Sequence, residues 1–325
     1  MLQRYRAPWW LPGGNVQTIW PALFSQRAAA RKALVPRYQR ERWATPDGDF
    51  IDVDFQHHAP DAPWLVLFHG LEGSSMSHYA QAFAHEAAQA GLNFAVPHFR
   101  GCSGELNLAP RAYHSGDFEE VGWILTRLRQ RAAAPLHVVG ISLGGNALLR
   151  WAEEAGTSAA ATAASVAAVC SPIDLTAGGH AIGSGFNRYS YTPMFLRTMK
   201  PRALAKLAQY PGLFDRERLI AARDLYDFDN VFTAPLHGFR DTDDYWMRGS
   251  AKPHLHAIRI PALVLNARND PFVPAACLPT PREVGHHVTL WQPDHGGHVG
   301  FAAGAPPGHV ATLPQAVLAW LRSPA

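Results

Sequence analysis

Runs of apolar residues and regular apolar spacings divide this chain into short strands and helices. Residues 64–68 form a continuous apolar run, which is typical of a strand buried on both faces of a sheet. Residues 49–56 alternate between apolar and polar, as a half-buried antiparallel strand does. In 117–131 the apolar residues recur at helical spacing and fall on one face. Further strands are predicted at 93–96, 136–139, 165–170, 262–265 and 287–290, and further helices at 77–90, 146–155 and 309–321.

This alternation of strands and helices predicts an α/β fold with a mostly parallel, doubly wound sheet. The alternation lapses over 174–250, which is rich in glycine and aromatic residues and carries a charged helical patch. We interpret 174–250 as a helical cap inserted over the carboxyl ends of the strands, where such sheets bind ligands. The predicted organisation is an N-terminal arm, 1–40, packed on a core that is formed by 41–173 and 251–325.

Composition narrows the class of protein. The 325 residues, 47% of them hydrophobic, are enough for one large domain, and a net charge of +3 without a Lys/Arg block argues against a nucleic-acid partner. We expect no integral membrane anchor, because no apolar run has the necessary length, and no apolar leader segment follows Met1. The cysteines, at 102, 170 and 277, lack disulfide or zinc spacing, which favours a cytoplasmic protein.

Candidate chemistry begins at Ser142, which lies between glycines in the string 140–145. The string follows the apolar run 136–139 and precedes a helix-prone segment. A serine at such a corner resembles a nucleophile elbow, in which a tight turn presents the hydroxyl at the edge of the sheet. The pattern alone has little specificity, since about one such chain in ten would contain it by chance.

A serine nucleophile needs a base and an orienting acid elsewhere in the chain. His298 lies in a glycine-rich loop after the last predicted strand, and His295 in the same loop is the alternative base. Asp270 follows the strand 262–265 and is the candidate acid, although Asp before Pro is also common in turns. The order Ser142, Asp270, His298 is the order expected of an α/β-hydrolase.

The oxyanion hole is predicted from backbone N–H groups. Leu143 follows the nucleophile at a helix N-terminus, and the loop after 64–68 offers Leu71, with Glu72 as the second choice. His69 in that loop is interpreted as structural. No cofactor or metal is expected, because the histidine pairs lack nearby ligands at metal spacing. The substrate-binding residues stay open, and the aromatic candidates for an acyl pocket are Phe186, Tyr189, Tyr191, Phe195, Tyr245 and Trp246.

Several longer strings resemble those of the YheT-like family of α/β-hydrolases, which includes the ABHD1/2/3-type esterases and lipases. The matching strings are 14–21, 69–74, 99–105, 113–116, 238–241, 244–246 and 297–301. The resemblance implies that Ser142, Asp270 and His298 form a catalytic triad that hydrolyses carboxylic esters. This chain departs from the family at Asn269, where relatives usually have a second acid.

The sequence therefore predicts a carboxylesterase-type serine hydrolase whose substrate is a small-molecule ester with a short to medium acyl chain. One alternative is an acyltransferase that moves an acyl group to an alcohol. The transferase motif of some relatives, His-x4-Asp, has only His114 with Glu119 as a counterpart here, which does not support transfer. The other alternative is a ligand-binding member of the fold that has lost catalysis.

Overall fold

The computed structural model describes residues 2–25 and 36–324, so part of the predicted N-terminal arm, 26–35, lies outside the described residues. In the described chain one eight-stranded sheet has the order β1-β2-β4-β3-β5-β6-β7-β8. β1 and β2 are antiparallel to their neighbours, and the remaining strands are parallel. The strands are β1 Gln39–Ala44, β2 Phe50–Gln56, β3 Trp64–Phe68, β4 Asn93–Pro97, β5 Leu136–Ile141, β6 Ser165–Val169, β7 Ala262–Leu265 and β8 Val288–Trp291.

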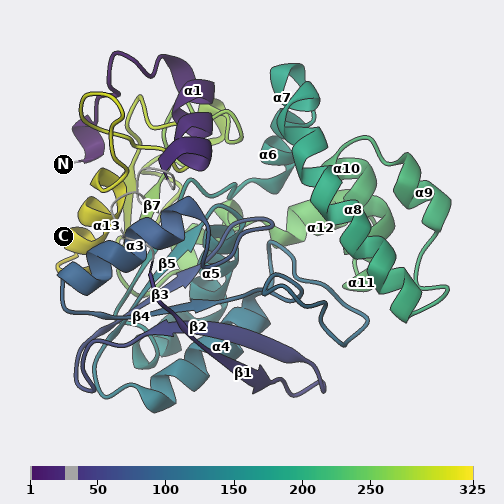
Figure 1. Ribbon diagram of the computed structural model, residues 1–325, viewed down its shortest axis with the longest axis horizontal. Coiled ribbons are helices and arrows are strands. Elements are labelled where there is room, and N and C mark those ends of the chain that lie inside the picture. Colours follow the sequence, from purple (N-terminus) through teal and green to yellow (C-terminus); the bar gives the residue numbers. More distant parts are fainter. Residues whose placement is uncertain (1, 26–35, 325) are drawn as a thin grey trace.

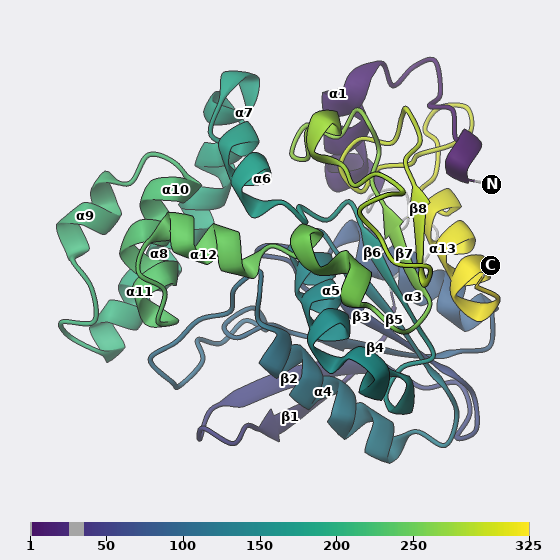
Figure 2. The same cartoon turned by 180° about the vertical axis from the view of Figure 1, so that it is seen from behind.

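Helices cover both faces of this sheet, as Figures 1 and 2 show. α3 and α13 pack on one face, where Leu65 and Leu67 of β3 point, and α4 and α5 pack on the other, with Val66 and Phe68. The predicted doubly wound α/β fold is therefore confirmed, and the continuous apolar run of β3 is explained by burial on both faces. The helices outside the segment between β6 and β7 are α1 Gly13–Trp20, α3 His78–Gln89, α4 Phe118–Arg131, α5 Leu143–Ala155 and α13 Thr312–Arg322.

The prediction of a half-buried strand at 49–56 was wrong in its burial. β2 is not half-buried, because six of its seven residues are buried. Its polar residues Asp52 and Asp54 are covered by arginines of the antiparallel strand β1, which the apolar pattern did not predict. Arg42 Nε lies 2.8 Å from Asp52 Oδ1, and Arg40 Nε lies 2.7 Å from Asp54 Oδ1. Partners from another strand therefore bury positions that alternation alone assigns to solvent.

A group of helices lies between β6 and β7 and stands to one side of the sheet (Figures 1 and 2). This inserted helical cap has its own hydrophobic core, which includes Leu219, Phe228 and Trp246. Its helices are α6 Leu175–Ile182, α7 Gly185–Tyr189, α8 Tyr191–Gln209, α9 Arg216–Ala221, α10 Leu225–Phe228, α11 Ala234–Leu236 and α12 Thr242–Gly249. The short 3-10 or π segments of the chain are η1 Leu2–Arg4, η2 Pro21–Ser25, η3 Gly156–Ala161, η4 Asp229–Thr233, η5 Lys252–Ala257 and η6 Ala275–Cys277. Among the residues described, no helix combines the length and apolar character that a membrane crossing needs.

Candidate active site

The turn between β5 and α5 holds Ser142 in a strained conformation. Its φ is 54° and its ψ is −120°, a region that residues with a side chain rarely adopt. The flanking glycines permit the turn. A Cβ on Gly140 would lie 2.5 Å from the carbonyl oxygen of Gly144, and a Cβ on Gly144 would lie 2.5 Å from that of His69. The backbone of 140–145 therefore has the geometry of a nucleophile elbow.

The structure brings Ser142, His298 and Asp270 into one hydrogen-bonded chain. His298 Nε2 lies 3.0 Å from Ser142 Oγ, and His298 Nδ1 lies 2.8 Å from Asp270 Oδ2. Asp270 is buried, and its Oδ1 accepts a hydrogen bond of 2.8 Å from the N–H of Phe272. With the Nδ1 proton donated to Asp270, Nε2 is free to accept the serine proton. His295, the alternative base, is exposed.

The predicted oxyanion donors differ in their availability. Leu143 is the first residue of α5, so its N–H has no acceptor within the helix. The N–H of Glu72 donates to Tyr113 Oη over 2.9 Å, so this group already has an acceptor. Within the described residues, no acceptor faces the N–H of Leu71. Of the two loop candidates, Leu71 is therefore the one whose N–H is available to a ligand.

His69 fixes the loop that carries Leu71. Its Nε2 accepts a hydrogen bond of 3.1 Å from the N–H of Phe99, so its Nδ1 carries the proton and donates to Gly70 O over 2.8 Å. Burial, together with the neighbouring His98, lowers the pKa of His69 to about 3. The side chain is neutral and joins the loop after β3 to the segment after β4.

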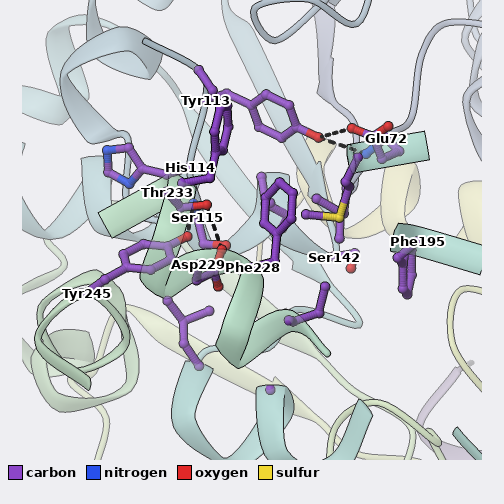
Figure 3. Close-up of a pocket in the computed structure, with 18 of the residues that line it drawn as sticks. Glu72, Tyr113, His114, Ser115, Ser142, Phe195, Phe228, Asp229, Thr233 and Tyr245 are labelled. Atoms are coloured by element: carbon purple, nitrogen blue, oxygen red, sulfur yellow. Dashed lines mark hydrogen bonds between the residues drawn. The ribbon is translucent and has the colours of Figure 1, made fainter. Parts of the chain in front are cut away.

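A cavity of about 130 Å³ opens beside Ser142 between the core and the helices of the cap. Figure 3 shows Ser142, Glu72 and Phe195 around this space together with Asp229 and Tyr245. Of the six aromatic candidates, Phe195, Tyr245 and Trp246 line the cavity. Tyr191 is buried elsewhere, and Phe186 and Tyr189 on α7 are 58% and 83% exposed. The face of each helix that packs against the core decides which aromatics reach the cavity.

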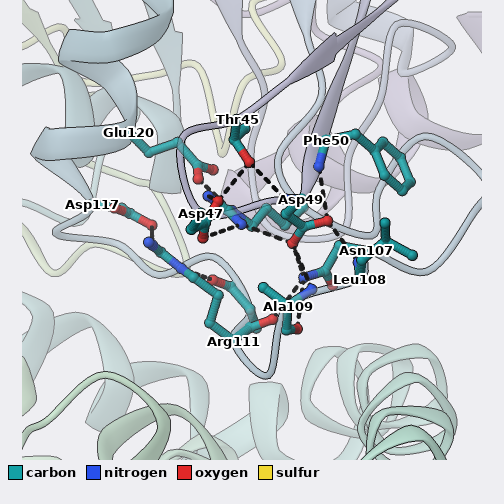
Figure 4. A network of polar contacts seen from close by, with 12 residues as sticks. Thr45, Asp47, Asp49, Phe50, Asn107, Leu108, Ala109, Arg111, Asp117 and Glu120 are labelled. Atoms are coloured by element: carbon teal, nitrogen blue, oxygen red, sulfur yellow. Dashed lines mark hydrogen bonds and ion pairs between the residues drawn. The ribbon is translucent and has the colours of Figure 1, made fainter.

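One wall of the cavity is a loop, 99–112, held by buried charges (Figure 4). Arg100 lies 2.8 Å from Asp49 and 2.5 Å from Glu120, and Asn107 Nδ2 donates to Asp49 over 2.7 Å. Burial opposes the charge of Asp49, but the hydrogen bonds from Asn107 and the loop backbone hold its pKa at about 2. Lys206 of α8 donates to Asn107 O over 2.6 Å, which ties the cap to the same loop.

Asp229 is a half-buried residue at the cap side of the cavity. Its Oδ1 accepts a hydrogen bond of 2.6 Å from Thr233, and its Oδ2 accepts one of 2.9 Å from Trp246 Nε1. Burial raises the pKa of Asp229 to about 6 from an ordinary value of 3.8. In the range between these values the folded protein holds a proton that the unfolded chain has lost. Stability therefore falls as the pH rises through this range.

We expect Asp229→Asn to remove this loss of stability with rising pH, because an uncharged amide can form hydrogen bonds with both Thr233 and Trp246. Relative to the wild type, the free energy of unfolding of the variant should rise between about pH 4 and pH 6, by up to about 3 kcal/mol. Urea unfolding across this pH range measures the difference. Asp61→Asn, at an exposed turn, is the control. A difference between Asp229→Asn and wild type that does not change with pH would contradict the prediction.

Other sequence candidates do not join the site as reactive groups. His114 lines the cavity, but Glu119 is exposed on α4, so the two residues do not form a transferase-type pair. Burial first, and then the nearby His237, lower the pKa of His114 to about 3. Across residues 2–25 and 36–324, no group of three or more His, Cys, Asp or Glu side chains could hold a metal ion.

Several residues that contact His298 or its loop carry no signal of a site role in the sequence. Phe272 packs against His298 with ring centroids 4.4 Å apart. Gln17 and Thr18 of α1 accept hydrogen bonds from backbone groups of the His298 loop. The only available signal for Gln17 and Thr18 was the string 14–21, which resembled the family but suggested no contact.

Comparisons with known proteins agree with this geometry. A family model described as the alpha/beta hydrolase fold matches residues 63–305. The Escherichia coli (strain K12) protein with the name "Putative esterase YheT" is 38% identical over 296 residues, 89% of this chain and 84% of that protein. Phospholipase ABHD3 of Bos taurus is 27% identical over 317 residues, 89% of this chain and 74% of that protein. The crystal structure of a membrane phospholipase A matches with a TM-score of 0.57 at 18% identity, over 95% of this chain and 93% of that one, and supports the fold.

The sheet order and the family model together define an α/β-hydrolase. The identity to YheT extends over most of both proteins. Within this class, the chain therefore belongs to the YheT-like family.

Proposed function

We propose that this protein is a serine hydrolase of the carboxylesterase type, with Ser142, His298 and Asp270 as its catalytic triad. The observation that carries the proposal is the hydrogen-bonded chain from Ser142 Oγ through His298 to Asp270 Oδ2, with distances of 3.0 and 2.8 Å. The names of its relatives, an esterase and a phospholipase, support the same chemistry.

In the proposed reaction, Ser142 Oγ attacks the carbonyl carbon of the ester while His298 Nε2 takes the serine proton. The N–H groups of Leu143 and Leu71 stabilise the oxyanion, each contributing about 3 kcal/mol in the transition state. His298 then protonates the leaving alcohol, and the acyl group stays on Ser142. A water that is deprotonated by His298 hydrolyses this acyl-enzyme, and the proton returns to Ser142 as the acid leaves.

We propose that the cap, 174–250, forms the acyl pocket and favours acyl chains of short to medium length. Its side chains supply most of the apolar lining of the cavity. These residues include Leu175, Ile182, Phe195, Met199, Leu225, Phe228, Phe232 and Trp246. The arm, 1–40, is proposed to pack on the core. A cytoplasmic location fits the free thiols of Cys102, Cys170 and Cys277.

An acyl-chain series tests the pocket. We expect kcat/KM to be highest for p-nitrophenyl butyrate to octanoate and to fall for the palmitate, because a cavity of about 130 Å³ limits the length of the chain. Phe195→Ala enlarges the cavity and should move the optimum to longer chains, whereas Phe186→Ala, at an exposed position outside it, should not. Equal shifts in both variants would contradict the pocket assignment. Ester formation in place of acid release, when ethanol is added, would favour the acyltransferase.

A further inference from the structure

The N-terminal helix α1 contacts the loop that carries His298, although about 280 residues separate them in sequence. Thr18 is buried, and its Oγ1 accepts a hydrogen bond of 2.8 Å from the backbone N–H of His298. The same hydroxyl donates to Gly14 O over 2.7 Å, which fixes the direction of its lone pairs. One side chain of α1 therefore holds the backbone of the proposed catalytic base.

Gln17, the neighbour of Thr18, connects the His298 loop to the Asp270 loop. Its Oε1 accepts hydrogen bonds of 2.9 Å from the N–H of Gly296 and from Asn269 Nδ2. Asn269 Oδ1 in turn accepts a hydrogen bond of 3.0 Å from the N–H of Gly297. Gln17 is 2% exposed, and its amide donates to Leu11 O in the segment before α1, which fixes the orientation of the side chain.

The backbones of these segments also pack closely. A Cβ on Gly14 would lie 1.8 Å from the carbonyl oxygen of Asn269, and a Cβ on Gly300 would lie 2.1 Å from that of Gln17. No side chain fits at either position, so α1 lies directly against both loops. Such an approach of three backbones leaves little freedom for the loops to shift while α1 stays in place.

The His298 loop needs such support because its backbone is strained. Val299 and Phe301 have φ values of 56° and 47°, in the left-handed region that disfavours residues with a side chain. Strained residues persist only when the surrounding structure fixes them. Here α1 supplies part of that support, because it accepts hydrogen bonds from the N–H groups of Gly296 and His298. Removing the acceptors on α1 leaves these groups unpaired and the loop free to relax.

We propose that Gln17 and Thr18 are positioning residues, which hold the loop of His298 at hydrogen-bonding distance from both Ser142 and Asp270. This inference rests on the proposed triad for its effect on catalysis. The contact of α1 with the loop stands independently of it. Displacing a catalytic group by about 1 Å can lower a rate by about 100-fold, so the network predicts a large kinetic effect from residues that do not touch the substrate.

The test compares Thr18→Val, which keeps the shape but removes the hydroxyl, with Thr18→Ser, which keeps the hydroxyl. For p-nitrophenyl butyrate, Thr18→Val should lower kcat by about 10- to 100-fold with little change in KM. Thr18→Ser, which keeps the hydroxyl, should retain most of the kcat of the wild type. Val16→Ala, at a 40% exposed position of the same helix, is the control and should match the wild type. Gln17→Leu should reproduce the loss of kcat. Thermal unfolding establishes that each variant is folded at the assay temperature.

Hydrogen exchange at the amides of 296–301 gives a readout that does not depend on ester hydrolysis. Thr18→Val should speed exchange at His298, whereas Thr18→Ser and Val16→Ala should not. Unchanged exchange and kcat in both Thr18→Val and Gln17→Leu would overturn the inference while the triad stands. A wild type that neither hydrolyses esters nor reacts with a fluorophosphonate would instead overturn the proposed function, and faster exchange in Thr18→Val would still support the positioning contact.

Discussion

Replacing Ser142 by alanine is expected to reduce kcat for p-nitrophenyl butyrate by about 10⁴-fold or more, because it removes the hydroxyl on which the proposed acyl-enzyme forms. Alanine keeps the Cβ of serine, so the strained turn at this residue and the packing of its glycine neighbours stay as they are. We therefore expect the variant to fold with an unchanged unfolding temperature. Residual hydrolysis should equal the contribution of binding and of the oxyanion hole alone.

The matched control is Ser158→Ala, which removes an exposed hydroxyl from η3, outside the cavity. It should retain the activity of the wild type. A fluorophosphonate should add to the wild type and to Ser158→Ala but not to Ser142→Ala, and peptide mass mapping should place the adduct on Ser142. Hydrolysis by Ser142→Ala at the rate of the wild type would show that the elbow serine is not the nucleophile.

Replacing Asp270 by asparagine is expected to reduce kcat by about 10⁴-fold near neutral pH, through the tautomer of His298. The N–H of Phe272 donates to one carboxylate oxygen, which leaves the other for His298 Nδ1. In the variant the amide oxygen accepts from Phe272, so the amide NH2 faces Nδ1. Nδ1 must then be the acceptor, and the proton on Nε2 prevents His298 from taking the proton of Ser142.

Asp294→Asn is the control for this variant, because Asp294 lies on the segment before His298 with its side chain 84% exposed. It removes the same charge close to the loop and should leave kcat near that of the wild type. Labelling by the fluorophosphonate should slow in Asp270→Asn, since it depends on the same proton transfer. If kcat of Asp270→Asn stays within about tenfold of the wild type, Asp270 is not the orienting acid.

The fold could be predicted because its signals are local. A strand buried on both faces, such as β3, must be apolar at every position, and α4 must show its apolar residues at helical spacing. β2 was predicted less well, because the arginines that cover Asp52 and Asp54 belong to a different strand. The apolar–polar periodicity of a strand indicates which face of the sheet each residue occupies, but not which other residues cover that face.

The candidate site was also predictable from the sequence only in part. The elbow is a local turn, so its glycines and Ser142 could be recognised from adjacent residues. The lining of the proposed acyl pocket depends on how helices of the cap turn toward the core, and only three of the six aromatic candidates line the cavity. Phe186 and Phe195 are nine positions apart in sequence, yet only Phe195 faces the cavity.

By itself, the sequence determined the strand–helix alternation, the elbow and the chain order of Ser142, Asp270 and His298, because each depends on neighbouring residues or on the order of elements. Only the tertiary structure decided that His298 rather than His295 faces the serine, and that Thr18 holds the loop of that histidine. These contacts join segments far apart in the chain. Their geometry follows from the packing of whole elements, which no local spacing records.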